Sequence, residues 1–187
     1  MASKKREHLI DTALELFYQN GFHATGIDRI LEVAGVARMT LYNHFKSKDE
    51  LILAALRRRD EKFRNWFMRT VETIGDTPDK RLPAIFDALA EWFNEKQFSG
   101  CMFINASAEF SGPDDPIHGV SAEHKNLILK YITKLAKDAD LANPEDVADS
   151  LMLLAEGAIV MRYVAGDEQA ASRAKLAAEK ILLASKA

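Results

Sequence analysis

The chain has 187 residues, of which 48% are hydrophobic and 28% charged, enough for a real core and a polar surface. Its single cysteine, Cys101, excludes an internal disulfide framework and cannot form a zinc cluster by itself. The net charge of −3 is unevenly distributed, because residues 1–64 hold 12 Lys and Arg against 9 Asp and Glu, whereas the remainder holds 13 against 19. A basic N-terminal end on an acidic body suits contact with phosphate.

Two segments bear on the cellular location. The first residues, MASKKREHLI, are basic but lead into amphipathic sequence, which is not typical of a signal peptide. The longest apolar stretch, LMLLAEGAIVM, is interrupted by Glu156 and is too short to cross a bilayer. We therefore expect a cytoplasmic protein with no membrane partner.

Apolar residues recur at helical spacing almost everywhere, and no alternation typical of strands is present. A first helix is expected over about residues 4–20, followed by Gly21 as a left-handed C-cap. Thr25 is expected to cap a second helix that ends at Gly35. A third, short helix is expected over about residues 38–45.

Six more helices, the fourth to the ninth, are predicted in the rest of the chain. A capping box formed by Ser47 and Glu50 opens the fourth, and Pro78 stands at the first position of the fifth. The expected ranges are about 47–74, 78–93, 101–110, 115–139 (or from Ser121), 143–166, and 167 to near the C-terminus. About nine helices with short connections predict an all-α protein.

The second and third predicted helices are joined by a turn containing Gly35, which is typical of a helix-turn-helix. In that motif the second helix enters the major groove and contacts bases from its N-terminal residues, here Arg38, Met39 and Thr40. Arginine can donate two hydrogen bonds to guanine, and Met39 and the Thr40 methyl group can pack on a thymine methyl group. The sequence therefore predicts double-stranded DNA as a partner.

Neighbouring polar residues are predicted to hold the DNA in place. Tyr42 and Asn43, one turn further on, can reach a base edge or a phosphate. His44 and Lys48 lie where the chain leaves the groove, and Lys48 also falls in the first turn of the fourth helix, whose amides attract phosphate. Thr25 has the same opportunity at the start of the second helix.

The order of residues in this region resembles a known family. An LF…NGF phrase followed by TGIDRILEVAGVARMTLYNHFKSKDEL is similar to the tetracycline-repressor (TetR/AcrR) family of bacterial regulators, over about residues 9–56. The resemblance implies an all-α homodimer with a helix-turn-helix domain over residues 1–48 and a helical ligand-binding and dimerisation domain over residues 49–187. It assigns base contacts to Arg38, Met39 and Thr40, and phosphate contacts to Thr25, Tyr42, His44 and Lys48.

Two positions depart from the family. Many members carry a hydroxyl where Ala37 stands, and a small residue or proline where Met39 stands. The first departure removes a helix cap and a phosphate contact, and the second is expected to change the operator sequence that is bound.

Three features of the N-terminal region have structural alternatives. Tyr42 and Phe45 could both be core residues. The segment 3–6 is either an arm that touches phosphate or the minor groove, or a solvated terminus. The run of arginines at 57–59 faces solvent or pairs with neighbouring acids, and we do not assign it to DNA.

The last two predicted helices carry stripes of small and aliphatic residues, which either close one subunit's core or pack against a second subunit. The stripes consist of Leu151, Leu154, Ala155, Ala158 and Ile159, and of Ala170, Ala174, Ala177, Ile181 and Ala184. In the resembled family these two helices form a four-helix bundle across a two-fold axis. A dimer suits one helix-turn-helix per chain, because two such helices about 34 Å apart can bind a palindromic operator.

Large residues in the middle of the chain suit either a core or a pocket for an apolar or aromatic small-molecule effector. They are Trp66, Phe67, Trp92, Phe93, Met102, Phe103, Phe110, Met152 and Tyr163. Glu156 joins them as a carboxylate on a largely apolar helix. It needs a partner such as Arg162, a histidine or a polar ligand group, unless it lies at an exposed edge.

Three classes of function remain to be compared. The first is a DNA-binding regulator, a repressor released by its ligand. The second is an enzyme in which Cys101 and a histidine act together, but no nucleophile–base pattern, phosphate loop or metal motif supports it, and we predict no cofactor and no metal. Cys101 itself is either an oxidation sensor at a helix start or a buried small hydrophobe. The third is a helical adaptor that binds a partner protein and no DNA.

Overall fold

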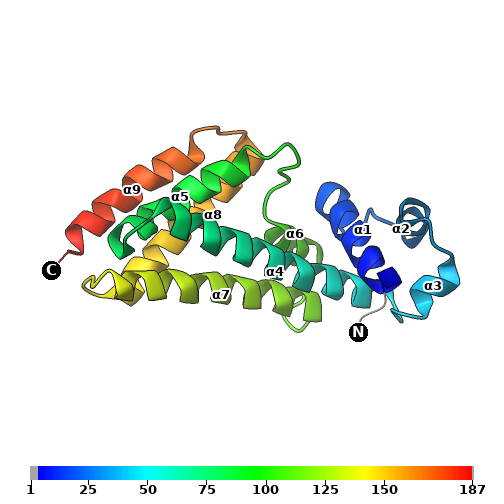
Figure 1. Cartoon of the computed structure of the whole chain (residues 1–187). Coiled ribbons are helices and arrows are strands. Elements are labelled where there is room, and N and C mark those ends of the chain that lie inside the picture. The colour runs from blue at the N-terminus through cyan, green and yellow to red at the C-terminus, as the bar shows by residue number, and fades with distance from the viewer. Residues whose placement is uncertain (1–3, 187) are drawn as a thin grey trace. The chain divides into compact units, whose positions relative to one another are not determined.

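The computed structural model describes residues 4–186, which form nine α-helices and no strand (Figure 1). The all-α prediction is thus confirmed. The helices are α1 (Lys4–Asn20), α2 (Ile27–Ala34), α3 (Arg38–Tyr42), α4 (Lys48–Ile74), α5 (Pro78–Phe93), α6 (Met102–Glu109), α7 (Pro116–Asp138), α8 (Pro144–Ala165) and α9 (Ala170–Ala184). None of these helices combines the length and hydropathy needed to cross a bilayer.

The described residues fall into two compact units. The first unit contains the residues up to Phe63 together with Cys101–His124, and the second contains Arg64–Gly100 and the residues from Lys125 onward. The helices α4 and α7 therefore contribute to both units. A domain boundary after residue 48 stays a prediction, since α4 continues unbroken from its start there.

The first unit is built around the buried faces of α1, α2 and α4. Phe17 of α1 stacks on Phe22 in the following turn, with ring centroids 5.3 Å apart. Leu41 and Phe45 are both buried, so they fix the short α3 and the turn after it to this core. Tyr42, in contrast, is on the surface, which decides between the two alternatives for these aromatic residues.

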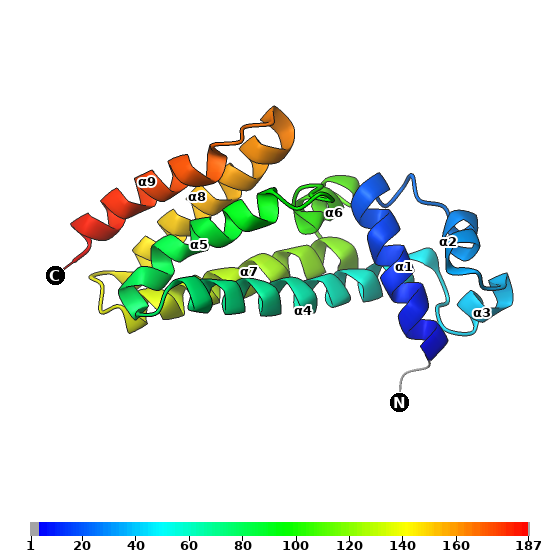
Figure 2. The ribbon, with the colours of Figure 1, turned by 45° about the horizontal axis from the view of Figure 1, so that its top comes forward.

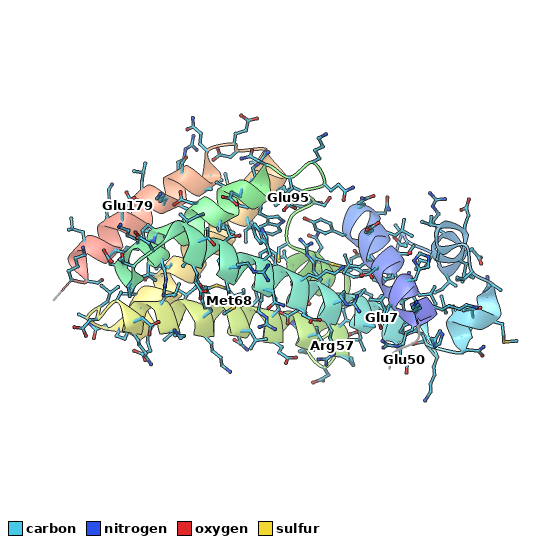
Figure 3. The ribbon with its side chains drawn as sticks, in the orientation of Figure 1. Glu7, Glu50, Arg57, Met68, Glu95 and Glu179 are labelled. Atoms are coloured by element: carbon cyan, nitrogen blue, oxygen red, sulfur yellow. The ribbon has the colours of Figure 1, made fainter. Side chains whose placement is uncertain are left out.

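Ion pairs join α4 to α1 within the first unit. Arg58 pairs with Glu7 and with Asp11, the latter at 3.1 Å, and Lys62 lies 2.8 Å from Asp11. Burial tends to raise the pKa of Asp11, but the two cations outweigh it and lower that pKa. Of the three consecutive arginines at 57–59 on α4, only Arg57 has an exposed side chain (Figure 3).

A second contact on the same helix pair is aromatic. The guanidinium of Arg59 lies over the ring of Tyr18, 4.5 Å from its centroid. The arginine run therefore differs from the expectation at Arg58 and Arg59, whose main partners lie on α1, although Glu61 also attracts Arg58. Both arginines hold α1 against α4.

The helices α5, α8 and α9 lie side by side in the second unit (Figure 2). The predicted stripe on α8 is mostly internal, because Leu151, Ala155, Ala158 and Ile159 are buried within the chain. Residues on another side of the same two helices are exposed instead, namely Leu153, Val160, Met161, Val164, Leu176 and Leu183. The stripes chosen from the sequence thus close the subunit's own core over much of their length.

Candidate nucleic-acid interface

The helix-turn-helix is formed by α2, a turn at Gly35 and α3. Gly35 adopts φ +63°, a left-handed conformation that favours glycine, and so ends α2 where the sequence predicted. Ala37 precedes α3 in an extended conformation and provides no side-chain cap, as its lack of a hydroxyl requires. The short α3 therefore depends on its buried side, and its other side is left at the surface.

The predicted base-contacting residues lie on that outer side of α3. Met39 is 71% exposed and Tyr42 44% exposed, whereas Leu41 between them is fully buried. The side chain of Arg38 is 56% exposed and pairs with Asp28 of α2. Thr40 is half-buried, and Asn43, which follows the last residue of α3, is exposed. The structure thus brings these five residues onto one short segment.

Lys48 lies in the first turn of α4 and reaches back to the turn between α1 and α2. Its Nζ donates a hydrogen bond to the carbonyl oxygen of His23 at 3.4 Å. Burial lowers the pKa of Lys48, although Glu109 and Asp49 oppose that shift. His44 is half-buried beside this region.

The capping box at the start of α4 forms with one difference from its usual pattern. The Ser47 hydroxyl oxygen accepts a hydrogen bond from the backbone N–H of Glu50 at 3.2 Å, as predicted. The Glu50 carboxylate accepts from the backbone N–H of Lys46 at 2.6 Å, one residue earlier than expected. Both bonds stabilise the turn that connects α3 to α4.

Thr25 does not cap α2, and that prediction was wrong. The N-cap of α2 is Gly26, without a side-chain hydrogen bond. The Thr25 side chain is buried, and its hydroxyl donates to the carbonyl oxygens of Gly21 at 2.7 Å and Leu16 at 3.3 Å. A phosphate contact from Thr25 stays a prediction, but its hydroxyl already donates hydrogen bonds to carbonyl oxygens at the C-terminal end of α1 and in the turn that follows.

The predicted N-terminal arm is described only in part. Ser3 lies outside the described residues, while Lys4 and Lys5 are exposed. The Arg6 guanidinium lies over the ring of Phe45, 5.1 Å from its centroid. Arg6 thus packs against the segment that follows α3.

Sequence reasoning missed Glu109, which fastens the turn after α1 to the end of α6. Its carboxylate accepts hydrogen bonds from the backbone N–H groups of Phe22 at 2.9 Å and His23 at 2.6 Å, and its Oε2 lies 2.8 Å from Nδ1 of His23. Burial tends to raise the pKa of Glu109, but these hydrogen bonds outweigh it and lower that pKa. One sequence signal was present, since an acid in the last turn of a helix opposes the helix dipole unless it has another partner.

The hydrogen bonds from Phe22 and His23 to Glu109 form a clamp between the turn after α1 and the end of α6, and two neighbouring residues add to it. Gly21 adopts φ +85°, and a Cβ added there would lie 3.0 Å from Glu109 Oε1. The ring of Phe110 stacks on His23 with centroids 4.7 Å apart. The clamp thus fixes the turn in which the carbonyl oxygen of His23 accepts the hydrogen bond from Lys48.

The predicted effector-pocket residues are divided between the two units. Met102, Phe103 and Phe110 belong to the first unit; the second holds Trp66, Phe67, Trp92, Phe93, Met152, Glu156 and Tyr163. Most are buried or half-buried, but Tyr163 is exposed. An effector pocket made from these residues stays a prediction.

Glu156 has a partner that the sequence analysis did not consider. Its carboxylate pairs with Nζ of Lys125 on α7 at 2.6 Å. Arg162, one of the expected partners, instead donates to the carbonyl oxygen of Phe93 at 3.3 Å. Cys101 is buried at the start of α6, and no group of three potential metal ligands occurs among the described residues.

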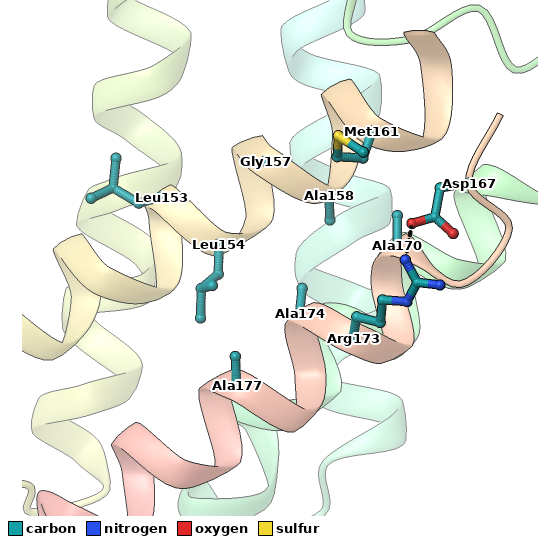
Figure 4. A pocket seen from close by; sticks show the side chains of 10 residues that line it. All are labelled: Leu153, Leu154, Gly157, Ala158, Met161, Asp167, Ala170, Arg173, Ala174 and Ala177. Atoms are coloured by element: carbon teal, nitrogen blue, oxygen red, sulfur yellow. Dashed lines mark hydrogen bonds and ion pairs between the residues drawn. The ribbon is translucent and has the colours of Figure 1, made fainter. Parts of the chain in front are cut away.

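A groove of about 330 Å³ runs between α8 and α9 (Figure 4). Its lining is mainly small and apolar and consists of Leu153, Leu154, Gly157, Ala158, Met161, Asp167, Ala170, Arg173, Ala174 and Ala177. One ion pair, Arg173 to Asp167 at 2.9 Å, closes one end. Two of the lining residues, Leu153 and Met161, are among the exposed apolar residues of α8.

Comparison with known proteins identifies the family. Residues 9–55 match the model of bacterial regulatory proteins of the tetR family, and residues 78–178 match the tetracyclin repressor-like C-terminal domain. The chain belongs to the TetR family. TetR-family proteins are helix-turn-helix transcriptional regulators that bind DNA and small-molecule effectors, not enzymes, and the all-α architecture found here is theirs.

Individual relatives match between about half and nearly all of the chain. SCO4454, a TetR-family transcriptional regulator from Streptomyces coelicolor, has a crystal structure with TM-score 0.89 and 30% identity, covering 98% of this chain and 96% of that one. The HTH-type transcriptional regulator YjdC of Escherichia coli is 24% identical over 178 residues, 95% of this chain and 93% of YjdC. The repressor NemR of Escherichia coli is 30% identical over 108 residues, 56% of this chain and 53% of NemR.

Proposed function

We propose that this TetR-family protein is a repressor that binds a palindromic operator as a homodimer through α3 and is released by a small apolar or aromatic effector. The observation that carries the DNA contact is the two-sided character of α3. Leu41 is buried and anchors the helix, while Arg38, Met39 and Tyr42 extend from it into solvent. Arginine on guanine and an apolar side chain on a thymine methyl group are the contacts that such a face can make in a major groove.

The proposed repressor role is supported by the name of one relative, since NemR is a transcriptional repressor. Release by an effector requires that the ligand prefer the form of the dimer that does not bind DNA. Both tryptophans of the chain, Trp66 and Trp92, are among the proposed pocket residues. Binding of the effector should therefore change the tryptophan emission at the same concentrations that release the operator.

The proposed homodimer uses the exposed apolar residues of α8 and α9. Leu153 and Val164 on α8 and Leu183 on α9 are largely exposed in the single chain, and Leu153 also lines the groove between these helices. Contiguous apolar surface of this kind marks sites of association. Two chains joined here would carry two copies of α3 to a palindrome.

Selection of bound fragments from a random DNA library, at two salt concentrations, tests the DNA contact. The wild-type protein should enrich a palindrome, and raising the salt should weaken binding because phosphate contacts release counterions. The double variant Arg38→Ala/Tyr42→Ala should lose the enrichment while keeping its helical content and oligomeric state. Arg57→Ala, which removes an exposed arginine from α4, serves as the matched control and should select the wild-type sequence.

Two results would contradict the proposal. The first is that the wild-type protein enriches no sequence. The second is that the double variant enriches the same sequence as the wild type. In either case the apolar surface of α8 and α9 would point instead to a helical adaptor that binds a partner protein.

A further inference from the structure

Asp28 places a negative charge beside the helix that is proposed to bind DNA. It lies in the first turn of α2, and its Oδ1 accepts a hydrogen bond from Nη2 of Arg38 at the start of α3. The two side chains are 82% and 56% exposed, so the pair contributes little to folding. The place of Asp28 in the first turn of α2 favours an acid only weakly through the helix dipole, and an exposed acid here is unfavourable for a phosphate-rich partner.

The contact leaves Arg38 able to bind a base. A guanidinium carries five N–H donors in a fixed plane, and Asp28 engages Nη2 only. The donors that remain are sufficient for the two hydrogen bonds to guanine O6 and N7. A long arginine side chain normally loses much rotamer freedom on binding, and the bond to Asp28 has already removed part of that freedom. Asp28 therefore positions Arg38 for guanine.

The charge of Asp28 weakens binding to every DNA sequence, so discrimination between sequences has to come through Arg38. Its repulsion from the DNA phosphates is the same on every sequence. On a site with guanine at the right position, Arg38 adds two hydrogen bonds that offset the repulsion. On any other base Arg38 stays paired with Asp28, and the repulsion has no compensation.

We infer that Asp28 is a specificity-determining residue that acts through Arg38 and sets how strongly the protein distinguishes its operator from other DNA. It is a positioning residue, since the contact to the base belongs to Arg38. The inference rests on the proposed function, in which Arg38 binds a guanine in each half-site.

A matched control lies on the same helix. Glu32 is four residues after Asp28, hence on the same side of α2, and pairs with Arg29 at 2.7 Å. That pair is also exposed, at 58% and 70%. Asp28→Asn and Glu32→Gln each remove one negative charge from α2 and replace one exposed ion pair with a weaker contact to a neutral acceptor, but only the first loosens Arg38.

The experiment measures the affinity of the full-length protein for the selected operator and for an operator in which the base pair assigned to Arg38 is replaced in both half-sites. Glu32→Gln should bind both DNAs several-fold more tightly than the wild type, because it has lost a repulsive charge. Asp28→Asn should bind the replaced operator about tenfold more tightly, while its affinity for the selected operator stays near that of the wild type, because the loss of Arg38 positioning offsets the lost repulsion there. In Asp28→Asn the ratio of the two affinities should fall about tenfold. In Glu32→Gln it should keep its wild-type value. In an Arg38→Ala background, Asp28→Asn should leave the ratio unchanged.

Each contrary outcome has a separate meaning. If Asp28→Asn and Glu32→Gln keep the same ratio, or if Asp28→Asn changes the ratio in the Arg38→Ala background, the inference about Asp28 is overturned while DNA binding by α3 stands. If Arg38→Ala retains the wild-type ratio, the proposed use of Arg38 fails, and the inference fails with it. Thermal unfolding of all variants within a few degrees of the wild type shows that the ratios report on binding.

Discussion

Replacing Glu109 with alanine should destabilise the first unit more than any single exposed substitution. The variant removes the acceptor of two backbone hydrogen bonds, at 2.9 Å and 2.6 Å, and of the bond to the His23 ring. Phe22 is fully buried, so its N–H would lose its partner without gaining full access to water. Leaving one buried donor unpaired costs about 1–3 kcal/mol.

The expected loss for Glu109→Ala is therefore about 2 kcal/mol in the free energy of unfolding. For a chain of this size it corresponds to a decrease of about 4–8 °C in Tm. Urea unfolding at one fixed protein concentration measures the loss, because the proposed dimerisation would make the apparent stability depend on concentration. Hydrogen exchange at Phe22 and His23 should accelerate together, which locates the effect at the turn after α1.

The same carboxylate predicts a dependence on pH. The folded pKa of Glu109 lies below its ordinary value of 4.5, so its contribution is fully present above that value and is lost as the pH falls through the lower folded pKa. Wild type and Glu109→Gln should therefore differ most at neutral pH and converge in acid. Glu123→Ala, which removes an exposed acid from α7, is the control and should change the stability by less than about 0.5 kcal/mol. A Glu109→Ala protein as stable as this control would refute the reasoning.

Three further predictions each concern a single position. Gly21→Ala should cost about 1 kcal/mol or more, because φ +85° strains any other residue and the new Cβ meets the Glu109 carboxylate; urea unfolding measures it. Leu153→Glu should shift the protein from dimer to monomer in sedimentation velocity, without loss of helical circular dichroism, since this side chain is mostly exposed in the single chain. Lys125→Met should lower the Tm by leaving the half-buried Glu156 without its cation, and adding Glu156→Gln should restore part of the loss; an unchanged Tm would contradict the pairing.

The helices could be predicted because their signals are local. Apolar spacing located the nine segments, and Gly35 stopped α2 where its left-handed conformation was expected. The helix α3 ended at Tyr42, earlier than predicted, although the buried Phe45 continues its apolar pattern. The apolar spacing in the sequence is the same whether the last buried residue lies in the helix or in the turn after it, so spacing alone could not locate the end of α3.

The wrong predictions concern the hydrogen-bond and ion-pair partners of side chains and the side of a helix that is buried. Both depend on contacts that the local sequence does not indicate. Thr25 had the composition of an N-cap, but nothing in the sequence indicates that its hydroxyl turns back to the end of α1. Glu156 finds Lys125 on another helix, and Glu109 finds a turn 87 residues away. The helix α8 is apolar around most of its circumference, so its periodicity could not distinguish the face that closes the subunit from the face that is exposed.

The division of α3 into a buried and an exposed side also bears on how such a protein can change over evolutionary time. Leu41 and Phe45 carry the packing of this segment, whereas Met39 and Tyr42 contribute little to the core. Substitutions at exposed positions of this kind usually alter stability by less than about 0.5 kcal/mol. New side chains at positions 39 and 42 can therefore be sampled one codon at a time with little effect on the folded state. Under the proposed DNA contact, a gene duplicate would acquire different target promoters without first being stabilised elsewhere.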